Sequence, residues 1–262
     1  MSDAGLTLRQ TAYGVTGFRR NARAVVFTVL MPIILLVLFA SVFTGHTQTT
    51  KAAGLPLSID AYFTAGITAY AITLAGFSSL MVAVVTARER GLLKRYRGTP
   101  MPSWVFLTAQ ILQSLVVVVL MSAVLLAIGL AAYDVHLSSR GALAFALYVV
   151  IGAATMCALG LAMSRVATTV DAASAIGPFT VVILGFVSGV FIPAEQLPSW
   201  LVDVGRVFPL SHLAVGLQRA FSPALSGSGI DAGNLAVLAL WGLAGIVIAL
   251  RSFQWEPLGA SS

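Results

Sequence analysis

Side chains that could carry out chemistry are few in this 262-residue chain, and none falls into a catalytic motif. The two lysines, Lys51 and Lys94, follow Thr and Leu, so the chain has no GxxxxGKS/T loop for nucleotide phosphates. It also has neither HExxH nor GxSxG, and its one cysteine, Cys157, excludes a disulfide or a CxxC metal site. The histidines lie far apart in the sequence, which predicts solvated loop residues rather than metal ligands: His46, His136 and His212. We therefore expect no enzyme activity, no metal site and no cofactor in this chain.

The densest group of charges lies at 88–97, with the sequence RERGLLKRYR. Leu92, Leu93 and Tyr96 are apolar within it, at the i, i+1 and i+4 spacing that forms one face of a helix. A charged helix with one apolar face suits a groove on a cytoplasmic protein, whereas a solvated loop has no use for that face. The alternative is a positive loop that only sets membrane topology. The residues predicted to dock are Arg88, Glu89, Arg90, Leu92, Leu93, Lys94, Arg95 and Tyr96.

Composition predicts the elements that position this segment. Hydrophobic residues make up 58% of the chain and charged residues 9%, against about 25% charged in a typical soluble domain. This balance excludes a soluble fold, a disordered chain and a nucleic-acid-binding domain, in spite of the net charge of +6. A bilayer is crossed by about 20 apolar residues, and six stretches qualify. They run over 25–43, 61–87, 105–132, 142–163, 172–192 and 232–250. The predicted fold class is an all-α membrane protein with six transmembrane helices.

The basic residues predict the orientation of these spans. Eleven of the fifteen Lys and Arg residues fall in the two terminal segments and in the alternate loops between the spans. Because cytoplasmic segments are enriched in Lys and Arg, both termini are predicted to lie in the cytoplasm. The spans contain no Asp, Glu, His, Lys or Arg, although ion-coupled transporters usually bury such a group near the midplane. If this protein does work, the energy must therefore come from elsewhere.

Residues 1–24 are predicted to form a cytoplasmic amphipathic helix ahead of the six-span domain at 25–262. Leu8, Ala12 and Val15 share one helical face, and arginines surround the rest of the helix. This pattern is typical of a helix that lies in the membrane interface with its arginines on anionic head groups. The alternative is a positively charged leader that only fixes topology.

Residues 193–231 form an outer segment that is too long and too apolar for a simple connection. Ser199 is predicted to cap one helix, which Pro209 ends, and Ser211 is predicted to open a second helix. We expect two short re-entrant or extracellular helices before the last span, at about 197–221, rather than a small soluble cap. Residues 45–60 are predicted to be a polar outer loop.

Aromatic residues recur at intervals of seven on two predicted spans. Phe63, Tyr70 and Phe77 do so on the second span, and Phe179 and Phe186 on the fifth. Such stripes suit a path for flat, apolar or cationic molecules, which aromatic faces bind. The alternative is ordinary helix packing or lipid contact. A GxxxG motif at 185–189 also permits close approach of another helix to the fifth span.

Four motifs carry a resemblance to a known family. They are RAVVFT at 23–28 followed by Met31-Pro32, the segment 88–100, SGVFIP at 188–193 with LP and WL at 197–201, and FPLSH at 208–212. With the six spans, these motifs resemble the membrane subunit of ABC-2-type exporters, close to the daunorubicin-resistance-type drug-export permeases of actinobacteria. The similarity covers nearly the whole chain.

The resemblance implies a division of labour in the bacterial inner membrane. A separate nucleotide-binding subunit binds ATP and Mg²⁺, and two copies of each subunit form the transporter, as a homodimer or a paralogous heterodimer. Segment 88–100 resembles the coupling helix that docks on that subunit, and 1–24 the connecting helix. The second and fifth spans are expected to line the substrate path, and the first and fifth to meet near the dimer axis. The outer helices resemble an extracellular gate, with candidate residues Phe191, Pro193, Trp200, Phe208 and His212.

The function implied is outward transport of apolar or amphipathic compounds, drug or lipid-like, by alternating access. One alternative is a lipid or polysaccharide exporter of the same superfamily. Another is a membrane protein that works without an ATPase, such as a secondary transporter or a structural protein.

Overall fold

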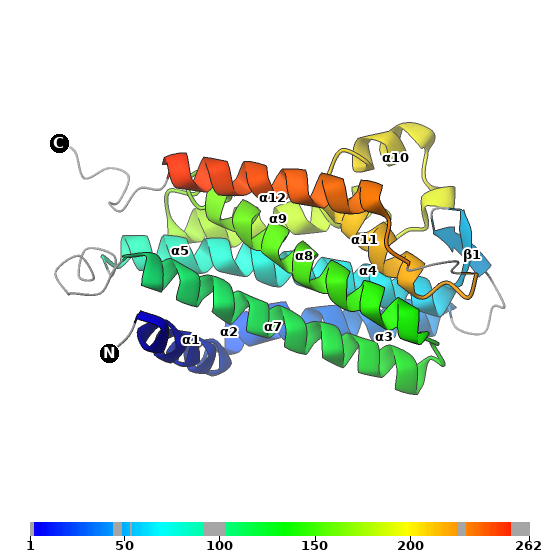
Figure 1. Cartoon of the computed structure of the whole chain (residues 1–262), viewed down its shortest axis with the longest axis horizontal. Coiled ribbons are helices and arrows are strands. Elements are labelled where there is room, and N and C mark those ends of the chain that lie inside the picture. The colour runs from blue at the N-terminus through cyan, green and yellow to red at the C-terminus, as the bar shows by residue number, and fades with distance from the viewer. Residues whose placement is uncertain (1–2, 44–48, 53, 92–102, 225–228, 253–262) are drawn as a thin grey trace.

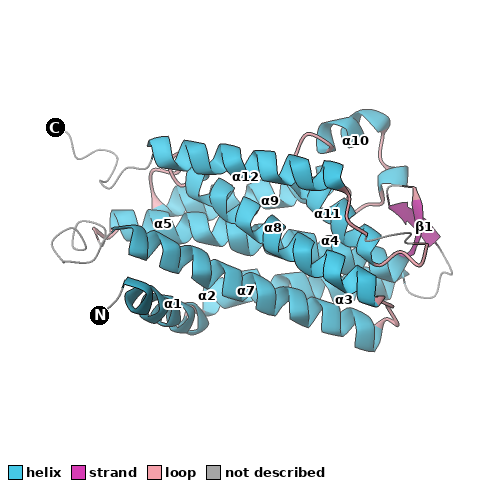
Figure 2. Ribbon diagram, viewed as in Figure 1, coloured by secondary structure: helices cyan, strands magenta, loops and turns pink. Residues whose placement is uncertain are grey.

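The computed structural model describes residues 3–43, 49–52, 54–91, 103–224 and 229–252. Its long helices run roughly side by side as one elongated bundle, and a small pair of strands lies at one end (Figures 1 and 2). Six helices in the described residues are long and apolar enough to cross a membrane, at Val26–Phe43, Ile59–Glu89, Val105–Ala132, Ser139–Met163, Val170–Val187 and Ala232–Arg251. The predicted fold class, an all-α membrane protein with six spans, is confirmed.

The first two spans are built from several helical segments each. The first consists of α2 (Ala22–Val25), a π-helical stretch η1 (Val26–Leu30) and α3 (Met31–Phe43). The second consists of α4 (Ile59–Thr73), a π-helical stretch η2 (Leu74–Ser79) and α5 (Leu80–Glu89). The two π-helical stretches face each other, because the hydroxyl groups of Thr28 and Ser79 lie 3.0 Å apart. π-helical turns are rare and are often found at functional sites.

The other four spans are single α-helices. They are α7 (Ser103–Ala132), α8 (Ser139–Met163), α9 (Val170–Val187) and α12 (Ala232–Ser252). Ser138 and Thr169 cap α8 and α9 by accepting hydrogen bonds from the main chain of the first helical turn, as short polar residues do at helix starts. These caps give both helices a defined beginning just outside the apolar stretch.

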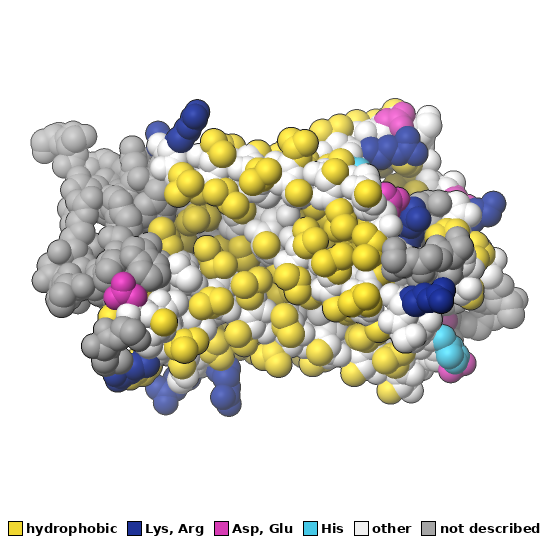
Figure 3. All heavy atoms as spheres, viewed as in Figure 1, with side chains coloured by type: hydrophobic (Ala, Val, Ile, Leu, Met, Phe, Trp, Pro, Cys, Tyr) yellow, Lys and Arg dark blue, Asp and Glu magenta, His cyan; other side chains and the backbone are white. Residues whose placement is uncertain are grey.

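The second span is the centre of the bundle. It is 83% buried within the protein, whereas the first, fifth and sixth spans are each 22% buried. It packs against α3, α7, α8, α9 and α11. On the face seen in Figure 3, apolar side chains cover the middle of the bundle and charged side chains gather at its two ends. That distribution matches a bilayer around the middle of the molecule.

The two termini lie at the same end of the bundle (Figure 1). There α1 (Asp3–Arg20) packs along the first part of α7, with Thr11 hydrogen-bonded to the carbonyl of Ala109 at 3.5 Å. Leu8 and Ala12 remain exposed on the face of α1 that the chain does not cover. The structure thus places an amphipathic helix within 1–24; its position in the membrane interface stays a prediction.

The opposite end of the bundle contains more secondary structure than the sequence analysis predicted. Residues predicted as a polar loop contain the antiparallel strands β1 (Thr49–Ala52) and β2 (Leu55–Ser58). Beyond α9 follow a short 3₁₀ turn, η3 (Ala194–Gln196), then α10 (Ser199–Gly205) and α11 (Pro209–Ala220). The prediction of two short helices here matches α10 and α11, but α10 ends earlier and Pro209 begins α11 instead of ending α10. Proline suits the first turn of a helix because its missing N–H has no partner there.

The fifth span ends at Val187, five residues before its predicted end. Gly189 has a φ of +70°, a conformation that side chains disfavour, and it turns the chain out of the helix. Gly185 instead makes room for Phe191, whose ring would lie 2.5 Å from a Cβ placed on this glycine. The GxxxG motif therefore lets the chain fold back on the fifth span and does not mark a helix crossing within the protomer.

Candidate functional site

The second span is tied to the connection between the fourth and fifth spans at the end of the bundle where the termini lie. The Arg88 guanidinium donates hydrogen bonds to the carbonyl oxygens of Ser164, at 3.0 Å, and Ala167. The neighbouring Glu89 carboxylate accepts a hydrogen bond of 2.8 Å from the backbone N–H of Val170, the first residue of α9. We call these two side chains and their three main-chain partners the Arg88–Glu89 clasp.

Burial strengthens the Arg88 half of this clasp, whereas Glu89 is exposed. Arg88 is only 4% exposed, and a buried guanidinium is stable only where its N–H groups find acceptors. The two carbonyls come from the turn after α8, which has left its helical hydrogen bonding and so offers free oxygens. The clasp joins three spans at a point where the sequence shows only a row of charges. Its main-chain partners leave no mark in the sequence.

Gly91 ends the second span directly after the clasp. Its φ is +65°, and its N–H bonds to the carbonyl of Arg88 at 3.1 Å, as in a glycine cap at a helix C-terminus. Of the residues predicted to dock on a partner, Arg90 is exposed, whereas Arg88 points into the clasp. Leu92, Leu93, Lys94, Arg95 and Tyr96 lie outside the described residues, so the docking helix at 88–100 stays a prediction.

An aromatic cluster joins the first, second and fifth spans in the half of the bundle away from the termini. Phe191, just beyond the fifth span, is the centre of this cluster. Its ring centroid lies 5.0 Å from Phe186, 5.2 Å from Tyr70 and 5.8 Å from Phe39. Phe39 in turn stacks on Phe63 at 5.1 Å. Ring contacts at these distances add to the stabilisation from burial alone.

The structure brings together three of the five residues predicted to line a substrate path. Phe63, Tyr70 and Phe186 belong to the aromatic cluster, but Phe77 and Phe179 do not. Phe63, Tyr70 and Phe77 are buried inside the protomer, whereas Phe179 is 67% and Phe186 48% exposed on α9. The sequence prediction missed Phe39, although its spacing of four from Phe43 on the first span was visible. The role of these residues in transport stays a prediction.

The candidate gate residues occupy different environments around α10 and α11. Phe191 and Pro193 are buried, Phe208 is half-buried, and Trp200 is 65% exposed on α10. A second link between spans lies beside them, because the Tyr62 hydroxyl of α4 donates a hydrogen bond to the carbonyl of Gly189. The second span therefore contacts the fifth at both of its ends.

His212 is a structural link and not the solvated loop residue predicted. It lies on α11, half-buried, and its Nδ1 is 2.7 Å from Oδ1 of Asn234 on α12. Its Nε2 is 2.7 Å from the carbonyl of Arg206, directly after α10. His212 thus holds α10, α11 and α12 together. Within the described residues, no three His, Cys, Asp or Glu side chains are grouped so that they could hold a metal ion.

Comparison with known proteins identifies a family that this chain matches. The family model described as "ABC-2 type transporter" matches residues 10–221. The matched range includes the clasp, the aromatic cluster and both short outer helices, and it ends before the last span.

Two curated relatives support the same assignment. The chain is 25% identical over 207 residues to "Putative transport permease YvfS" of Bacillus subtilis (strain 168), covering 78% of this chain and 82% of the relative. It is 27% identical over 132 residues to "Probable multidrug ABC transporter permease YbhR" of Escherichia coli (strain K12), covering 50% of this chain and 35% of the relative.

Proposed function

The chain belongs to the ABC-2 type transporter family and is a multi-pass membrane permease of an ABC transporter, and from this premise we propose that it exports apolar or amphipathic compounds. Membership of the family implies an ABC ATPase subunit as partner. In this proposal that subunit binds ATP and Mg²⁺ and docks on the segment 88–100. The docking end, with both termini, lies in the cytoplasm of a bacterial cell, since it holds most of the basic residues.

The observation that carries the proposal is the Arg88–Glu89 clasp. The docking segment begins inside the second span, at Arg88 and Glu89, so a displacement of its later residues by the ATPase acts first on these two side chains. These side chains hold the residues between α8 and α9, from Ser164 to Val170. A push on the docking segment therefore moves the second, fourth and fifth spans as one unit. An apolar core transmits such a movement because it is close-packed and hardly compressible.

The second span carries this movement to the outer end of the bundle. There Tyr62 bonds to Gly189, and Tyr70 packs on Phe191, so both ends of the fifth span follow the second. A path along Phe63, Tyr70 and Phe77 requires the aromatic cluster to open, because these side chains are buried in the present conformation. Alternating access then consists of opening this cluster towards one side of the membrane at a time.

Exposed aromatic and aliphatic side chains on the fifth span suggest the cargo and the dimer interface. Phe179, Ile183 and Phe186 are exposed along α9, and Ile34 and Leu38 are exposed along α3. Two copies that meet along these faces would enclose an apolar space lined by aromatic rings. Such a space suits apolar or cationic drug-like molecules or lipids. The word "multidrug" in the name of the Escherichia coli relative agrees with a drug-like cargo.

The proposal is tested by purifying the permease together with its ABC ATPase subunit. We expect a stable complex whose ATPase activity rises when apolar compounds are added. Two charged residues of the docking segment could be reversed, Glu89 and Arg95. Reversal of Glu89 would also break its hydrogen bond to Val170 in the clasp, so Arg95 is the informative position. Arg95→Glu should insert normally in the membrane and lose ATPase association. A variant that keeps full association and stimulation would exclude segment 88–100 as the docking site.

A further inference from the structure

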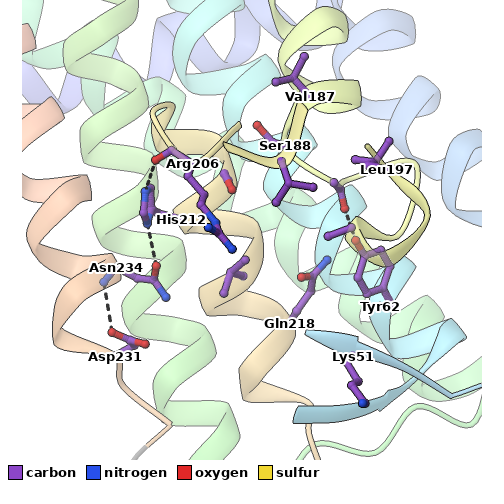
Figure 4. A pocket seen from close by; sticks show the side chains of 15 residues that line it. Lys51, Tyr62, Val187, Ser188, Leu197, Arg206, His212, Gln218, Asp231 and Asn234 are labelled. Atoms are coloured by element: carbon purple, nitrogen blue, oxygen red, sulfur yellow. Dashed lines mark hydrogen bonds between the residues drawn. The ribbon is translucent and has the colours of Figure 1, made fainter. Parts of the chain in front are cut away.

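A pocket of about 340 Å³ lies at the end of the bundle away from the termini (Figure 4). It is formed where β1, α4, α10, α11 and the start of α12 meet the residues that follow α9. Its volume is within the range of about 300–1,000 Å³ that small-molecule sites have in proteins. The lining combines apolar side chains, among them Val187, Leu197 and Val202, with polar and charged ones. Such a lining suits a molecule with both a polar and an apolar part.

Two buried side chains in the lining have polar atoms without a partner. Gln218 is 2% exposed and Ser188 is 6% exposed, yet within the described part of the chain neither Nε2 of Gln218 nor Oγ of Ser188 makes a hydrogen bond. In Figure 4 Gln218 extends from α11 towards Tyr62, and its amide interacts with the Tyr62 hydroxyl without forming a hydrogen bond of good geometry. Buried polar atoms without partners are unfavourable, and proteins usually keep few of them.

Two of the buried side-chain atoms without a partner lie in the lining of the pocket. Among the residues that the structure describes, five buried side-chain atoms lack a partner, and they belong to Thr50, Ser122, Ser188, Gln218 and Arg219. Ser188 and Gln218 line the pocket, whereas Thr50 on β1, Ser122 on α7 and Arg219 on α11 do not. The unpaired atoms of Ser188 and Gln218 thus mark this pocket as a place where an additional hydrogen-bonding group belongs.

Several polar groups of the pocket already have partners, and those without one can donate hydrogen bonds. Asp231 is already satisfied, because its carboxylate accepts from Arg219 at 2.7 Å and from the backbone N–H of Gly233 at 2.9 Å. Tyr62 donates to Gly189, and both ring nitrogens of His212 are bonded. Among the other lining side chains, the amide N–H groups of Gln218 and the hydroxyl of Ser188 make no hydrogen bond, and the ammonium of the exposed Lys51 has no ion pair within the described residues.

We propose that this pocket binds the anionic head group, a carboxylate or a phosphate, of an amphipathic molecule. Three donors, one of them a cation, favour an anion rich in acceptor atoms, because hydrogen bonds to charged groups are the stronger ones. The apolar lining receives the first carbons of the chain attached to that head group. The two possible sources are a membrane lipid and a free amphipathic acid. The site does not depend on ATP hydrolysis or on the partner subunit.

The test uses the full-length permease in a neutral maltoside detergent, without the ATPase. Thermal unfolding is followed by tryptophan fluorescence while decanoate, phosphatidylglycerol, inorganic phosphate or decanol is added. A ligand that binds the folded state raises the unfolding midpoint, which yields its dissociation constant. We expect a saturable rise with decanoate or with phosphatidylglycerol, and the one that binds more tightly identifies the source. Decanol and inorganic phosphate, which each lack half of the proposed ligand, should have little effect.

Matched variants connect the binding to the pocket. Gln218→Leu and Lys51→Gln should each weaken binding by about tenfold, since each removes a donor to a charged group. Ser122→Ala removes an unpaired hydroxyl outside the pocket and should leave binding unchanged. Gln218→Leu should not lower the midpoint of the ligand-free protein, because it removes a buried atom without a partner, so weaker binding will not reflect misfolding. The proposal is overturned if neither decanoate nor phosphatidylglycerol binds, or if decanol or inorganic phosphate binds as tightly as they do. It is also overturned if Gln218→Leu and Lys51→Gln bind these ligands as tightly as the wild type does.

Discussion

Removing Arg88 is expected to release the connection between the fourth and fifth spans. In Arg88→Ala the carbonyls of Ser164 and Ala167 lose their donor in a buried site. A hydrogen bond to a charged group contributes about 1.5–3 kcal/mol, so losing both, with partial relaxation, costs about 3 kcal/mol locally. Since about 1.4 kcal/mol corresponds to a factor of ten, opening of this segment becomes more frequent by on the order of 100-fold. Arg88→Lys keeps the charge but not the planar group that bonds to two acceptors at once, so it should increase opening of the segment by an intermediate amount.

Hydrogen–deuterium exchange of the amides at 164–170, measured in the permease without the ATPase, checks this value. Arg88→Ala should accelerate exchange by on the order of 100-fold and lower the number of molecules transported per ATP hydrolysed. Arg90→Ala is the control, because Arg90 is the exposed neighbour on the same helix end and should leave exchange at 164–170 unchanged. A less than about threefold acceleration, or equal acceleration in both variants, would refute the clasp as the link between the spans.

Three further changes test the outer half of the bundle. Phe191→Ala should lower the free energy of unfolding by about 3–5 kcal/mol, because it removes the centre of the aromatic cluster. Phe179→Ala, at an exposed ring, should lower it far less, and equal thermal unfolding midpoints of the two variants would contradict this. His212→Ala should cost about 1–2 kcal/mol and accelerate amide exchange in α10, because two hydrogen bonds to its neighbours are lost; unchanged exchange there would count against the link. Tyr62→Phe should accelerate exchange at Gly189 and its neighbours about fivefold, and no change would show that the hydroxyl does not hold the fifth span.

The sequence was sufficient to predict the spans but not how their ends are fixed. Long apolar stretches without charge determine where a helix crosses the bilayer, and five of the six observed spans match the predicted ones to within a few residues. The fifth ends early because Gly189 adopts a positive φ, and glycine alone does not reveal that choice. The strand pair at Thr49–Ala52 and Leu55–Ser58 was missed because each strand has only four residues, too few for an alternating pattern to be recognised.

The candidate site could be predicted in part. The charges at 88–90 pointed to the correct end of the second span, but a charged residue that faces a partner protein and one that bonds to the chain's own carbonyls look alike in the sequence. Arg88 belongs to the second kind, and its acceptors lie more than 70 residues away in the sequence. The aromatic stripes likewise identified Phe63 and Tyr70, whereas their contact with Phe191 depends on how the chain turns after Gly189.

The most direct test of the central claim is transport into inside-out membrane vesicles that contain this permease and its ABC ATPase. Uptake of rhodamine 6G, an apolar cation, is followed by fluorescence quenching with and without ATP. We expect uptake that requires both subunits and ATP, that stops when the phosphate-binding lysine of the ATPase is replaced, and that falls in Arg88→Ala. Uptake by the permease alone, driven by an ion gradient and indifferent to ATP, would contradict the central claim.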